Sequence, residues 1–83
     1  MPRSYTKPPS KEKVQVTFGA ALRAYREARS LTQEALAELA DLHTNYVSSV
    51  ERGERNLGLH NIARLAYALD MPVSRLMGCL DPH

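Results

Sequence analysis

Four small polar side chains lie close together in the middle of this 83-residue chain: Thr44, Asn45, Ser48 and Ser49. All four donate and accept hydrogen bonds, and all are short enough to let a helix that carries them approach another polar surface closely. The edges of base pairs in a major groove are such a surface, and Asn45 has the geometry to form two hydrogen bonds to an adenine. Polar residues of this kind are also typical of a solvated helix face. The elements around them must decide between the two interpretations.

The four residues lie on a helix predicted over 44–52. A second helix is predicted just before it, over 33–40, because all eight residues there are good helix formers and Thr32 can cap the first amides. Residues 41–43 connect the two. A short helix, a three-residue turn and a second short helix with a polar outer face make up a helix-turn-helix arrangement.

Helical spacing of apolar residues predicts three more helices, over 17–29, from Leu59 to just before Pro72, and from Val73 to about Cys79. We therefore expect an all-α fold of five short helices, with the helix-turn-helix at helices two and three. Residues 1–16 are expected to form a flexible basic arm, 17–80 a DNA-binding and dimerisation domain, and 81–83 a tail. The side chains expected to lock the two central helices together are Leu36, Leu39, Leu42, Val47 and Val50, with Ala37 at the close crossing.

The net charge of the chain does not by itself indicate a function. Residues 1–13 hold four basic side chains against one acid, a net charge of +3, whereas residues 14–83 hold seven arginines against eight acids, a net charge of −1. Cys79 is the only cysteine and the three histidines lack metal-ligand spacing, so we expect no disulfide, metal or cofactor. We also expect no enzyme activity, no membrane span and a cytoplasmic location.

The ordered fragments Leu31-Thr32-Gln33-Glu34, Leu36-Ala37, Tyr46-Val47-Ser48, Glu51-Arg52-Gly53, Asn61-Ile62, Leu65-Ala66 and Ala68-Leu69 carry a resemblance to a known family. The chain resembles the lambda-repressor-like (Cro/CI-type, XRE) helix-turn-helix regulators over about residues 18–77. Within that family it looks most like the controller proteins of restriction–modification systems. The resemblance implies a sequence-specific transcriptional regulator that binds double-stranded DNA.

The resemblance also implies roles for particular residues. Thr44, Asn45 and Ser49 match the family's base-reading positions, with Ser48 next to them, and Gln33 would lie at a DNA phosphate. Arg26 would pair with Glu51 in an architectural ion pair. Apart from the resemblance, the further candidates for phosphate contacts are Thr32, His43, Arg23, Arg52 and Arg55. Two positions depart from the family pattern: Asp41 stands where glycine is usual in the turn, and His43 stands where Ser or Thr usually caps the third helix.

One recognition helix contacts only a few base pairs, so we expect a homodimer on an inverted-repeat operator. The residues expected at the dimer interface are Leu59, Tyr67, Met71, Val73, Leu76, Met77 and Leu80. Two alternatives stay open. The chain could be an antitoxin that binds a toxin partner and regulates its own operon, or a phage-type repressor without a second domain. Restriction–modification genes beside this one would favour the controller, and a small toxin gene would favour the antitoxin.

Overall fold

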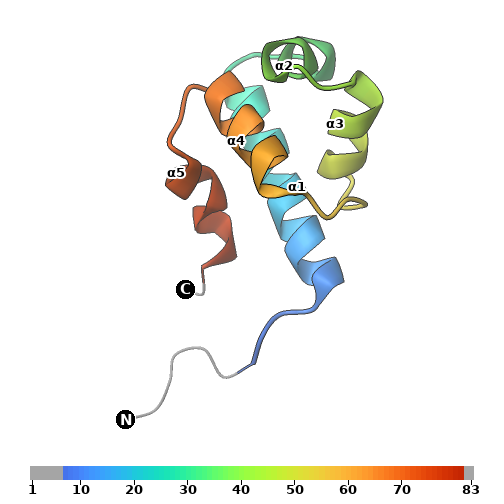
Figure 1. Ribbon diagram of the computed structural model, residues 1–83, viewed down its shortest axis with the longest axis vertical. Coiled ribbons are helices and arrows are strands. Elements are labelled where there is room, and N and C mark those ends of the chain that lie inside the picture. The colour runs from blue at the N-terminus through green and yellow to red at the C-terminus, as the bar shows by residue number, and fades with distance from the viewer. Residues whose placement is uncertain (1–6, 82–83) are drawn as a thin grey trace.

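The computed structural model describes residues 7–81 and forms five α-helices in that part of the chain, followed by one short 3₁₀ helix (Figure 1). The elements are α1 (Lys11–Ala28), α2 (Gln33–Ala40), α3 (Thr44–Glu51), α4 (Leu59–Ala68), α5 (Val73–Met77) and the 3₁₀ helix η1 (Gly78–Leu80). The predicted all-helical fold with a helix-turn-helix at α2 and α3 is confirmed. Arg3 of the predicted arm and residues 82–83 of the predicted tail lie outside the described residues.

The first helix begins six residues earlier than the apolar spacing predicts. Ser10 is its N-cap and accepts a hydrogen bond from the amide of Lys13 at 3.1 Å, and Glu12 places a negative charge in the first turn. Residues 11–16, expected to belong to a flexible arm, are therefore helical. The prediction over 17–29 relied on apolar spacing, which is weak in this exposed first turn and a half.

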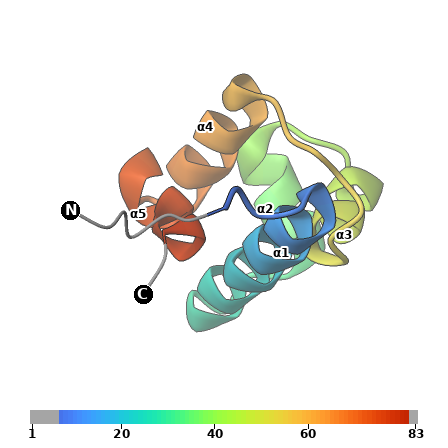
Figure 2. The same cartoon turned by 90° about the horizontal axis from the view of Figure 1, so that it is seen from below.

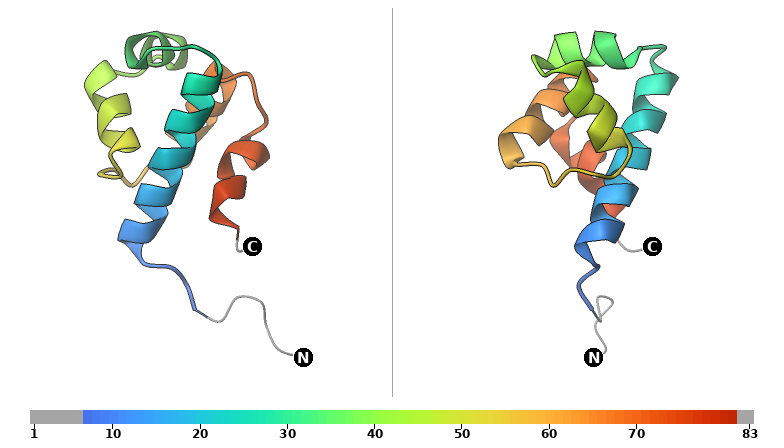
Figure 3. Two further views of the ribbon diagram at one scale, coloured as in Figure 1. Left: turned by 180° about the vertical axis from the view of Figure 1, so that it is seen from behind. Right: turned by 90° about the vertical axis from the view of Figure 1, so that its right-hand side faces the viewer.

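The long helix α1 supports the other elements. α3 packs against one side of α1, and α5 with η1 packs against another, as the views of the domain from below and from behind show (Figures 2 and 3). α2 lies across one end of the domain in contact with α3 and α4. The space between them is filled by fully buried side chains, among them Leu22, Leu36, Val47, Leu65 and Leu76. This core fixes α3 relative to α1 and leaves one side of α3 free.

The contact between α1 and α3 is close enough to require glycine. A Cβ added at Gly19 would collide with the carbonyl oxygen of Val50 and lie 2.8 Å from that of Glu51. One predicted packing residue is misplaced: Leu39 is 60% exposed on the outer side of α2, so Leu36, Val47 and Val50 lock α2 to α3 without it. Within the described residues, no helix is both long and apolar enough to cross a membrane.

Candidate nucleic-acid interface

The turn between α2 and α3 is well formed despite its two unusual residues. Asp41 ends α2 in the left-handed conformation, with φ of 57° and ψ of 48°, which an aspartate adopts more readily than most side chains. His43 caps α3, because its Nδ1 accepts a hydrogen bond from the amide of Asn45 at 3.0 Å. The N-terminus of α2 is capped by Thr32, whose hydroxyl accepts from the amide of Ala35 at 3.0 Å. Both helices therefore begin at fixed points.

Three of the four predicted base-reading residues are accessible on α3. Asn45 is exposed, and Thr44 and Ser48 are half-buried. Ser49 is only 4% exposed, so the prediction that it contacts bases is wrong. Its hydroxyl donates to the carbonyl of Tyr46 at 2.7 Å and accepts from Nε of Arg55 at 3.0 Å. These contacts use the hydroxyl inside the protein, where it fastens the loop after α3 to the helix.

The same loop is held by Tyr46, which sequence reasoning did not assign to the site. The guanidinium of Arg55 lies 5.6 Å from the centre of the Tyr46 ring, within the range of a cation–π contact. The Tyr46 hydroxyl accepts a hydrogen bond from the side-chain amide of Asn61 on α4 at 3.1 Å. Arg55, a predicted phosphate contact, is thus oriented by two side chains of α3. Its terminal nitrogens form no hydrogen bond within the described residues.

The predicted pair of Arg26 and Glu51 is present and nearly buried. Nε and a terminal nitrogen of Arg26 donate to the two carboxylate oxygens at 2.6 and 2.9 Å, and the side chains are 11% and 3% exposed. The hydrogen bond with Glu51 raises the pKa of Arg26, against the opposing effect of burial. Arg26 also donates to the carbonyl of Leu31 at 2.8 Å. The pair therefore joins α1, the α1–α2 connection and α3.

Gln33, a predicted phosphate contact, belongs to the same network. Its side-chain nitrogen donates to Glu51 at 3.1 Å, which holds the first residue of α2 against the end of α3. A phosphate at this helix start would meet free backbone amides and the positive end of the helix dipole. The arrangement thus places the N-terminus of α2 beside the C-terminal end of α3.

A second arginine–carboxylate pair lies at the exposed end of α3. Nε and a terminal nitrogen of Arg52 donate to the two carboxylate oxygens of Glu54 at 3.0 and 3.2 Å, and the other terminal nitrogen donates to the hydroxyl of Ser48. The hydrogen bond from Arg52 lowers the pKa of Glu54. By contrast, Arg23, another phosphate candidate, lies on α1 with only Glu27 as its partner among the described residues, at 3.4 Å in an exposed pair.

The residues predicted for a dimer interface separate into two groups. Leu59, Tyr67 and Val73 are 86%, 83% and 41% exposed, as an interface residue in a free protomer should be. Met71 and Leu76 are 8% and 0% exposed and belong to the core, so the assignment of the fully buried Leu76 to the interface is wrong. Met71 also lines a depression beside Tyr67, and its assignment stays a prediction. A domain this small needs these side chains for its own core.

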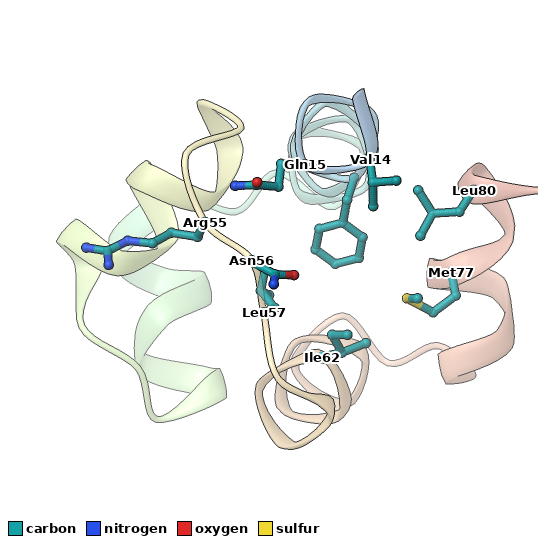
Figure 4. Close-up of a pocket in the computed structure, with 9 residues that line it drawn as sticks. Val14, Gln15, Arg55, Asn56, Leu57, Ile62, Met77 and Leu80 are labelled. Carbon is teal, nitrogen blue, oxygen red and sulfur yellow. The ribbon is translucent and has the colours of Figure 1, made fainter. Parts of the chain in front are cut away.

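Met77 and Leu80 were also expected at the interface, but they pack against the core. Both face an apolar pocket of about 140 Å³ between α1, the loop before α4, α4, α5 and η1 (Figure 4). Phe18 and Ile62 line the same pocket. Both side chains are half-buried, so their place at a dimer interface stays a prediction.

This geometry defines a DNA-binding domain of the helix-turn-helix class. The family model described as "Helix-turn-helix" matches residues 22–76, and the chain belongs to this family of non-enzymatic transcriptional regulators. The control protein C.SmaI from Serratia marcescens is 46% identical over 56 residues, which cover 68% of this chain and 67% of C.SmaI. The control protein C.BamHI from Bacillus amyloliquefaciens is 38% identical over 65 residues, covering 77% of this chain and 80% of C.BamHI.

A solved structure shows the same likeness in three dimensions. The crystal structure of the restriction–modification controller protein C.AhdI from Aeromonas hydrophila superimposes with a TM-score of 0.73 and 50% sequence identity. The match covers 75% of this chain and 94% of C.AhdI. The protein is therefore a DNA-binding transcriptional regulator that resembles restriction–modification controller proteins.

Proposed function

We propose that the protein is the controller of a restriction–modification system and binds an inverted-repeat operator as a homodimer. The observation that carries the proposal is the exposed polar face of α3, which the buried Arg26–Glu51 pair holds in a fixed place. The control proteins C.SmaI and C.BamHI and the controller C.AhdI, to which the chain is similar, support the biological setting.

In this proposal Asn45 reads a base directly, and Thr44 and Ser48 lie beside it on the accessible face. Asparagine is suited to an adenine, to which it both donates and accepts a hydrogen bond. The small neighbouring side chains let the helix enter the groove. Base contacts by these residues would give the sequence specificity that a regulator of a single operon needs.

Phosphates would be held around this face by residues from α1, the start of α2, the turn before α3 and the loop after α3. The proposed contacts are Gln33, Thr32, His43, Arg23 and Arg55. Since residues 14–83 carry a net charge of −1, affinity must come from where these groups lie and not from the overall charge. Arg55 is the best-oriented of them, because Ser49 and Tyr46 already fix its side chain.

Dimerisation supplies a second recognition helix for the second half-site of the operator. Two recognition helices about 34 Å apart meet the major groove on one side of the duplex. The exposed apolar side chains of Leu59, Tyr67 and Val73 are the proposed interface, since water would otherwise surround them. A shallow depression of about 230 Å³ beside Tyr67, lined also by Asp70, Met71 and Pro72, has room for a side chain of the second copy.

Footprinting on the DNA upstream of the protein's own gene tests the proposal. We expect two protected half-sites related by a dyad and separated by about one helical turn, with the protein bound as a dimer. A single protected half-site bound by a monomer would contradict the dimeric arrangement. Absence of any protected site on this DNA would contradict the proposed role at its own promoter.

A further inference from the structure

We propose that Arg52 reads a guanine in each operator half-site and that Glu54 and Ser48 position it for this role. The inference deepens the proposed function and rests on it. The sequence alone indicated Arg52 only as a candidate phosphate contact. Its surroundings in the structure fit a base edge better than a phosphate.

Arg52 lies on the same face of α3 as the proposed base readers. It follows Asn45 by seven residues and Ser48 by four, spacings that align side chains on a helix. Its hydrogen bond to the Ser48 hydroxyl turns the guanidinium back along the helix toward Asn45. The long side chain therefore extends over the reading face instead of away from it.

The hydrogen bonds of Arg52 within the domain leave two of its N–H groups available to donate to DNA. A guanidinium has five N–H groups, and the contacts with Glu54 and Ser48 use three of them. One N–H group remains on each terminal nitrogen. Guanine presents two acceptors, O6 and N7, in the major groove, and an arginine donating to both is the commonest specific contact there.

Glu54 distinguishes a base contact from a phosphate contact. Its carboxylate is bound to Arg52 through both oxygens, so the pair has little net charge and attracts a phosphate less strongly than an arginine without a carboxylate partner would. A guanine edge carries no net charge, so a contact with it depends more on the orientation of the guanidinium than on its charge. The carboxylate thus weakens Arg52 as a phosphate clamp while holding its fork in one geometry. Arg55, with no carboxylate in its hydrogen bonds among the described residues, is the better phosphate contact of the two.

The test measures binding of wild-type protein, Arg52→Ala, Glu54→Gln and the control Arg23→Ala to the footprinted operator. In a set of DNAs, each guanine of the half-site is replaced in turn by 7-deazaguanine, which lacks the N7 acceptor. We expect one position per half-site at which wild-type binding falls about 2- to 12-fold, roughly half the free energy of a bidentate contact, because the substituted base keeps its O6 acceptor. Arg52→Ala should bind the substituted and unsubstituted DNAs equally at that position, and discrimination elsewhere should be unchanged.

Glu54→Gln should lose part of the discrimination at that same position without losing affinity for unrelated DNA. Arg23→Ala, which removes an exposed arginine with a carboxylate partner, should weaken binding to every DNA by one factor and keep all discrimination. If Arg52→Ala behaves like Arg23→Ala and also lowers the salt dependence of binding, Arg52 is a phosphate contact and the inference is wrong. If the wild-type protein itself binds no operator, the proposed function fails instead.

Discussion

Replacing Glu51 by glutamine should destabilise the domain strongly, although the change is one atom in size. The carboxylate accepts two hydrogen bonds from Arg26 and one from Gln33, and its side chain is 3% exposed. Glutamine keeps one acceptor oxygen but turns a donor toward Arg26, which is left buried without a counter-charge. Breaking a buried ion pair in this way costs about 3–5 kcal/mol.

We expect a loss of about 3 kcal/mol for Glu51→Gln, at the lower end of that range, because one acceptor oxygen survives. For a domain of this size the loss corresponds to a fall in Tm of roughly 12–24 °C. Urea and thermal unfolding followed by circular dichroism measure it. The matched control is Glu27→Gln, which removes an exposed pair on α1 and should cost only about 0.3–0.5 kcal/mol.

A double variant separates the ion pair from simple packing. Arg26→Met combined with Glu51→Leu removes both charges and should be more stable than either single variant, since neither charge is left buried without its partner. Equal stability of Glu51→Gln and the wild-type protein would refute the reasoning, because it would mean that water or another group satisfies Arg26. A double variant less stable than both single variants would show that the packing of these two side chains contributes more to stability than their charges do.

Three single positions give further predictions. Gly19→Ala should destabilise the domain by about 1–3 kcal/mol in urea unfolding, because its Cβ meets the backbone of α3. The control Gly78→Ala, with open space around the added Cβ, should not destabilise it. Equal stability of the two variants would contradict the close approach of α1 and α3. Tyr67→Asp should leave the circular dichroism spectrum unchanged but give a monomer in sedimentation, and a dimer of wild-type affinity would exclude this surface. Burial raises the pKa of the Cys79 thiol, so the native chain should react with iodoacetamide more slowly at pH 8 than the urea-unfolded chain. The stability that the buried thiol contributes should be fully present at neutral pH and should decline as the pH rises above about 8.5, where the thiol of the unfolded chain ionises first. Equal rates of reaction would contradict the raised pKa.

The fold was largely predictable because its signals are local. The caps at Thr32 and His43, the turn at Asp41 and the apolar spacing of the helices each act within a few residues. The early start of α1 was predictable as well: Ser10 follows two prolines and precedes an acidic first turn, a typical N-terminal pattern. Apolar spacing was the wrong guide there, because the first turn of α1 is mostly exposed.

The site was predictable only where the family pattern covers long-range contacts. Arg26 and Glu51 are 25 residues apart, and nothing in composition or spacing alone brings them together. Ser49 was assigned wrongly from the sequence, because its residue type does not distinguish it from the polar residues beside it. Its burial depends on where the loop with Arg55 returns to α3, which local sequence does not encode. Likewise, Met71 and Leu76 belong to an apolar stripe whose division between core and surface depends on the packing of α4 and α5.

The most direct test of sequence reading by α3 concerns Asn45, which is exposed whereas Thr44 and Ser48 are half-buried. The measurement compares the affinity of wild-type protein and Asn45→Ala for the footprinted operator and for random-sequence DNA at one salt concentration. We predict that Asn45→Ala loses about 1–3 kcal/mol on the operator, relaxes specificity at one position per half-site and keeps its affinity for random DNA. Equal weakening on both DNAs would show that the exposed face of α3 does not read the sequence.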